Sequence, residues 1–88
     1  EPDITLDLLA KVKANPENLD MRLTAAKALA GSGRNEEAIE HLLYSIAKNR
    51  SYNNEAARLF LLTIFEAEGA TSEISINGRR ALSSILFA

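Results

Sequence analysis

The sequence predicts an all-α fold of about five helices, arranged as antiparallel helix hairpins. Apolar residues recur at helical spacing in successive segments, and short connections rich in Gly, Pro or Asn separate them, whereas no segment alternates as a strand does. Residues 33–37 are typical of the turn between two antiparallel helices. Gly33 can take the left-handed conformation that ends one helix, and Asn35 can accept hydrogen bonds from the first N–H groups of the next. An acidic first turn then suits the positive end of that helix.

The first helix is expected to run to about Ala14 from an N-cap at Asp3 or Thr5. Its apolar side chains lie at helical spacing: Ile4, Leu8, Leu9 and Val12. Asn15 is a suitable N-cap for the second helix, and Pro16 suits the first helical position because no N–H is needed there. That helix runs to about Ser32, with one face made of Leu19, Leu23, Ala26 and Ala30.

The third and fourth helices follow the glycine corner. The third is expected over about residues 36–48, because two adjacent apolar stripes recur there at helical spacing. Ser51 or Asn53 is the expected N-cap of the fourth helix, which runs to about Glu68 and ends before a left-handed Gly69.

The last helix is expected to begin between Ser72 and Asn77, and Gly78 is an internal weak point in it. Residues 59–65 of the preceding helix are apolar almost all round, so they need cover on several sides. We therefore expect the third and fifth helices to flank the fourth. Its predicted core residues are Phe60 and Leu62.

The composition describes one small domain spanning residues 1–88. Of its 88 residues, 47% are apolar and 25% are charged, which is enough for one modest core. The net charge is -2, and the ten Lys and Arg residues are scattered, so no nucleic-acid partner is expected. The longest apolar run is far shorter than a membrane span, and no membrane contact is expected. The predicted location is the cytoplasm.

Residues that could carry chemistry are few. There is no cysteine, and His41 is the only histidine, so a metal or acid–base site would need partners that the sequence does not supply. His41 is expected to be a solvated surface residue. Glu36, Glu37 and Glu40 are interpreted as a complement to the helix dipole rather than as paired catalytic carboxylates. We therefore expect no enzyme activity, no metal and no cofactor.

The second and third helices fit the 34-residue tetratricopeptide pattern without gaps when Ala38 is set at position 20. Four further residues then fall at matching positions of the pattern: Ala26, Gly33, Leu42 and Ser45. Pro16 falls at position 32 of a preceding repeat, which makes the first helix the second helix of an incomplete unit. Arg22, Leu29 and Arg50 depart from the pattern, and an ordinary helical hairpin is the alternative. The predicted architecture is a fragment of a right-handed superhelix.

Several segments resemble the C-terminal helical region of bacterial thioredoxin-like co-chaperones, in which tetratricopeptide-like repeats follow a thioredoxin-type domain. The resemblance covers about residues 15–87 and rests on the following segments: Asn15-Pro16-Glu17-Asn18, Gly33 to Ala38 with Leu42-Leu43, Asn54 to Arg58, Leu62 to Ala67 and Gly78 to Phe87. It implies that the chain belongs to a longer protein with an N-terminal thioredoxin-like domain. It also implies a protein-binding tail that contacts unfolded clients or chaperones. The alternative is a structural or oligomerisation module that binds no client.

Two surfaces are candidates for protein binding. A groove on the inner faces of the second and fourth helices should favour apolar or mixed segments, and its candidate residues are Leu23, Lys27, Ala56 and Phe60. Three arginines could hold an acidic segment: Arg58, Arg79 and Arg80.

The first helix does not look like a solenoid cap, because its apolar residues cover more of the circumference than one neighbouring helix can bury. Its free face, with Ile4 and Leu8, is expected to meet further repeats or a second copy as a homodimer. The alternative is that the first helix folds inward against the second.

Overall fold

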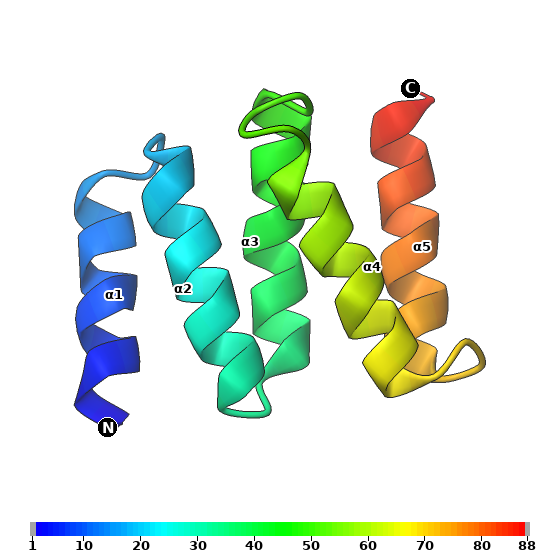
Figure 1. The fold of residues 1–88 in the computed structure, drawn as a ribbon, viewed down its shortest axis with the longest axis horizontal. Coiled ribbons are helices and arrows are strands. Elements are labelled where there is room, and N and C mark those ends of the chain that lie inside the picture. Colours follow the sequence, from blue (N-terminus) through cyan, green and yellow to red (C-terminus); the bar gives the residue numbers. More distant parts are fainter. Residues whose placement is uncertain (1, 88) are drawn as a thin grey trace.

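The computed structural model describes the backbone of residues 2–87 and the side chains of residues 7–87. This part of the chain forms five helices and no strand: α1 (Pro2–Ala14), α2 (Leu19–Gly31), α3 (Asn35–Lys48), α4 (Ala56–Glu68) and α5 (Glu73–Leu86). Successive helices run antiparallel, with α1 and α5 at opposite ends of the row (Figure 1). The molecule measures 32 × 25 × 18 Å along its principal axes. The prediction of an all-α fold of helix hairpins is confirmed.

The helices pack with their neighbours in sequence, and α3 is at the centre. It contacts α2, α4 and α5, and α4 also contacts α5, so α3 and α5 flank α4 as the sequence predicted. By contrast, α1 approaches α2 alone among the described helices. The arrangement therefore has a well-covered half around α3–α5 and a less covered end at α1.

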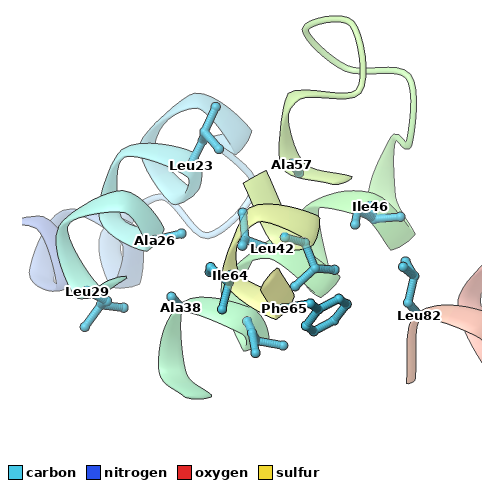
Figure 2. Close-up of a cluster of buried hydrophobic side chains, with 12 residues drawn as sticks. Leu23, Ala26, Leu29, Ala38, Leu42, Ile46, Ala57, Ile64, Phe65 and Leu82 are labelled. Carbon is cyan, nitrogen blue, oxygen red and sulfur yellow. The ribbon is translucent and has the colours of Figure 1, made fainter. Parts of the chain in front are cut away.

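Small residues bring α2 and α3 close together. Ala26 and Ala38 are both fully buried, and a side chain that ends at Cβ lets two helix backbones approach. Figure 2 shows this seam continuing into branched side chains from α2, α3 and α4, with Leu82 reaching in from α5. The core is one continuous cluster and not a set of separate patches.

The sequence prediction for the start of α2 is wrong by three residues. Asn18, and not Asn15, is the N-cap, and its side-chain oxygen accepts a hydrogen bond from the Met21 N–H at 3.1 Å. Asn15 instead ends α1, because its N–H donates to the Lys11 carbonyl at 3.0 Å. Pro16 therefore lies in the turn between the helices and not in the first turn of α2.

The starts of α3 and α4 also differ from expectation. Gly33 has the predicted positive φ of 81°, but Asn35 is already helical, and its side chain donates to the Glu68 carboxylate of α4 instead of capping α3. Glu55 is the N-cap of α4, so neither Ser51 nor Asn53 has that role. Three consecutive residues, 53–55, have φ between 52° and 62°. This left-handed turn moves the start of α4 beyond the predicted caps.

The buried face of α4 lies one position away from the one expected. Leu61, Ile64 and Phe65 are buried, whereas Phe60 and Leu62 are only half-buried. The apolar run offered several possible inner faces, and packing against α3 and α5 selected one of them. The prediction of Phe60 and Leu62 as core residues is therefore wrong.

Gly78 lets the backbone of α5 pack directly against α4. A Cβ atom at Gly78 would lie 2.5 Å from Cε1 of the fully buried Phe65 ring, which is far below van der Waals contact. On the same side of α5, the Ser75 hydroxyl donates to the Phe65 backbone carbonyl at 3.2 Å. Gly78 is therefore a packing requirement of the hairpin rather than the weak point that its helix propensity indicated.

Substitution of Gly78 by Ala should lower the free energy of unfolding by about 1–3 kcal/mol, because the added Cβ would force the fully buried Phe65 ring or the α5 backbone to shift. The matched control is Gly31→Ala, since Gly31 is also helical and a Cβ atom there would have nothing within 4 Å. This control should be neutral or up to about 1 kcal/mol more stable, as helix propensity predicts. Urea unfolding of both variants measures the difference. Equal stability of Gly78→Ala and Gly31→Ala would contradict the packing argument.

Candidate functional site

The residues proposed for a groove lie on α2 and α4, the first helices of the two hairpins, which contact each other. Lys27 of α2 places its ammonium 5.9 Å from the centroid of the Phe60 ring of α4, within the range of a cation–π interaction. Ala56 is half-buried beside Phe60 at helical spacing, but Leu23 is only 7% exposed and belongs to the core. Lys27, Ala56 and Phe60 are therefore at least partly exposed, as a binding surface requires, whereas Leu23 is buried.

The three candidate arginines have different surroundings. Arg58 forms an ion pair at 2.7 Å with Glu55, the N-cap residue of the same helix. The guanidinium of Arg79 lies 5.0 Å from the centroid of the Phe65 ring, so it covers the core at the α4–α5 seam. Arg80 is exposed. Among the described residues, Arg79 and Arg80 form no ion pair, so of the three arginines these two keep a charge available to an acidic partner.

The first helix is described only in part at the level of side chains. Ile4 lies outside the residues whose side chains the structure describes. Leu8 is half-buried and lines a shallow hollow between α1 and the start of α2, together with Met21. Leu8 therefore lies at the α1–α2 seam, and its remaining exposed surface is the part that a second copy would have to cover.

A cluster that the sequence does not signal joins α2 to α3 around Arg22. The Arg22 guanidinium carbon is 3.5 Å from the centroid of the Tyr44 ring, and its Nε donates to the Pro16 carbonyl at 2.7 Å. Its Nη1 lies 3.2 Å from Nδ1 of His41. The repeat pattern marks Arg22 only as a departure from an aromatic position. The planar guanidinium stacks where a ring would stack, and it also donates hydrogen bonds.

The hydrogen bond to Arg22 defines the state of His41. A guanidinium can only donate, so Nδ1 of His41 must accept, and the proton of the neutral ring is on Nε2. Burial and then the positive charge of Arg22 lower the pKa of His41, while Glu40 and Glu37 act weakly in the opposite direction. The ring is half-buried, so the prediction of a solvated surface histidine is wrong.

The polar groups of residues 7–87 do not gather into a metal site. No group of three or more His, Cys, Asp or Glu side chains within the described residues is placed to hold a metal ion. No helix in this part of the chain is long and apolar enough to cross a lipid bilayer.

Comparison with known proteins agrees with the hairpin geometry. A family profile described as tetratricopeptide repeat matches residues 2–87. The chain belongs to the tetratricopeptide repeat family. The family is a non-catalytic interaction module, and its members mediate contacts between proteins.

One curated relative connects these repeats with a thioredoxin. The TPR repeat-containing thioredoxin TTL4 of Arabidopsis thaliana is 36% identical over 70 residues, which cover 77% of this chain. The same match covers 10% of the plant protein, so this chain spans about a tenth of its relative's length. The matched part is thus a repeat segment within a much larger protein.

The burial of His41, together with its contact with Arg22, should make the free energy of unfolding depend on pH near neutrality. Because the pKa of His41 is lower in the folded than in the unfolded chain, where it is close to 6.5, the unfolded state binds the proton first as the pH falls. The free energy of unfolding should therefore be greatest above pH 6.5 and fall as the pH drops from about 7.5 towards about 5.5. Denaturant titrations at a series of pH values measure this.

The matched variant is His41→Asn, which has an acceptor oxygen near the position of Nδ1 but does not titrate. It should lose the pH dependence in this window. Glu37, whose pKa is lowered mainly by its hydrogen bond to Arg34, affects stability only below its ordinary value of 4.5. An unchanged pH profile in His41→Asn, or an NMR titration of His41 with a pKa above 6.5, would contradict the assignment.

Proposed function

We propose that this chain is the protein-binding tail of a thioredoxin-linked co-chaperone, and that it contacts unfolded clients or chaperones through the face formed by α2 and α4. The observation that carries the proposal is the pairing of Lys27 with the half-buried Phe60 ring across the two helices. An accessible aromatic ring beside a single cation can contact apolar side chains and also accept an acidic or polar neighbour. This mixed chemistry suits segments of unfolded proteins better than it suits one defined sequence.

The surface of α4 extends the same face. Ala56, Phe60 and Thr63 recur at helical spacing, and Leu59 beside them is 52% exposed, which is high for a large apolar side chain. Apolar side chains left at the surface in one stripe are a feature of interaction sites. The stripe therefore supports the choice of α2 and α4 over the other helices as the client-binding face.

The wider context is also part of the proposal. The relative whose name combines repeats with a thioredoxin supports a parent protein that also contains a thioredoxin-like domain. We propose that this domain precedes the repeat unit. The chain itself contains no cysteine, so thiol chemistry would belong to that other domain. We place the parent protein in the cytoplasm, where chaperones and unfolded chains meet, and we assign it neither a nucleic-acid nor a membrane partner.

The isolated chain should suppress the aggregation of a reduced or heated client protein. Phe60→Ala removes the ring of the proposed face and should raise the concentration needed for half-maximal suppression roughly tenfold, a loss of about 1.4 kcal/mol of binding. The matched control is Phe87→Ala, which removes a ring that is 84% exposed elsewhere on the surface. Light scattering of the client reports the result. Equal suppression by both variants, or none by the wild-type chain, would refute client binding at this face.

A structural role is the second candidate, and the position of α1 favours it. This helix approaches α2 alone among the described helices, so part of its surface remains available to a further repeat or to a second copy. Leu8 is half-buried at the α1–α2 seam, so a substitution at this position tests whether α1 mediates association.

If α1 mediates a homodimer, light scattering should give the mass of two chains at high micromolar concentration. Leu8→Glu should then give monomers that retain the helical circular dichroism of the wild type, because a charge at the contact opposes association. Leu59→Glu, on α4, is the control and should remain dimeric. A wild-type monomer under these conditions would exclude self-association through α1.

A further inference from the structure

The alternate helices α1, α3 and α5 occupy equivalent places in the row, but they are not equally spaced (Figure 1). Cα atoms of α3 and α5 approach within 8 Å, whereas no described residues of α1 and α3 do. A groove of about 540 Å³ lies between α1 and α3 as a result, against about 360 Å³ for the groove between α3 and α5. The wider groove is large enough to admit side chains of another polypeptide.

The walls of the α1–α3 groove are apolar, and the polar side chains that line it are basic. Leu9, Val12 and Pro16 provide the apolar part. Lys13 of α1, Arg22 of α2 and His41 of α3 converge on the same space, and none of the lining residues is acidic. Three helices thus each contribute a side chain that can donate a hydrogen bond to one small volume.

Arg22 is the group best placed to bind a ligand there. Its Nε and Nη1 contact Pro16 and His41, which leaves three of the five guanidinium donors without a partner among these contacts. The ion pairs of the described residues do not include Arg22, so no carboxylate neutralises its charge. Stacking on Tyr44 holds the guanidinium carbon at 3.5 Å from the ring centroid. A pre-oriented and unneutralised guanidinium is suited to a planar carboxylate.

The α3–α5 groove provides a contrast within the same molecule. Its walls are also apolar, with Ile39, Leu43 and Ile74, but Glu36, Glu37 and Glu40 line it. The two grooves therefore have similar apolar walls and opposite charge. This difference predicts which segments each groove would reject, because like charges at a contact are unfavourable.

We propose that the groove between α1 and α3 binds an acidic, apolar segment of a partner polypeptide, with a Glu or Asp carboxylate on Arg22 and a neighbouring apolar side chain against Leu9 and Pro16. Arg22 and Lys27 lie five residues apart on α2, about 140° around the helix. The groove is consequently separate from the α2–α4 face, and either proposal can fail without the other.

The test uses three blocked pentapeptides that differ at one position: acetyl-Gly-Leu-Glu-Leu-Gly-amide and its Gln and Lys counterparts. At low salt the Glu peptide should bind at least about fivefold more tightly than the Gln peptide, because a charged hydrogen bond to Arg22 is lost in the latter. Binding measured by ¹H–¹⁵N NMR should shift the amides of Lys13 and His41 and the Nε–H of Arg22. The Lys peptide should leave these signals unchanged.

Three variants complete the experiment. Arg22→Gln should abolish the preference for the Glu over the Gln peptide. Lys13→Glu, at an exposed position that leaves the core intact, should weaken Glu-peptide binding even if Arg22→Gln folds poorly. Lys27→Glu, on the α2–α4 face, should change nothing. Equal binding of the Glu and Gln peptides, shifts confined to Lys27 and Phe60, or no binding at millimolar peptide would each overturn the proposal.

Discussion

The contact between the Phe65 ring and the backbone of α5 at Gly78 is the constraint on which the arrangement of the second half depends. Phe65 is fully buried, and no side chain separates its ring from α5, since a Cβ at Gly78 would lie 2.5 Å from Cε1. The Ser75 hydroxyl of α5 also donates a hydrogen bond to the Phe65 backbone carbonyl of α4, next to this contact. Because α5 also contacts α3, these three helices contribute side chains to the same core.

The first half of the molecule lacks an equivalent constraint at α1. Ala26 and Ala38 allow α2 and α3 to pack closely, but α1 contacts α2 without its described residues reaching α3. Arg22 occupies the region between them, where it stacks on Tyr44 and donates to the Pro16 carbonyl of the α1–α2 turn. An aromatic ring at this position would provide packing without a positive charge. The guanidinium fills space and also brings a positive charge to the edge of a groove.

These two packing outcomes explain why the molecule has surfaces of different chemistry. The first helices of the hairpins, α2 and α4, share a face where a lysine meets an aromatic ring. The second helices, α1, α3 and α5, are separated by one basic and one acidic groove. The two proposed binding surfaces therefore draw on different sets of helices within one small repeat unit.

The sequence by itself determined the number of helices, their antiparallel order, the positive φ of Gly33 and the tetratricopeptide family, because hydrophobic periodicity and turn residues are local signals. Tertiary structure decided the features that depend on what lies opposite. Asn35 donates to Glu68 instead of capping α3, since a carboxylate from α4 reaches it. Leu61, rather than Phe60 or Leu62, is buried, since α3 and α5 select the face of an apolar helix. The Arg22–His41–Tyr44 cluster depends on a contact across 19 residues, which no local pattern specifies.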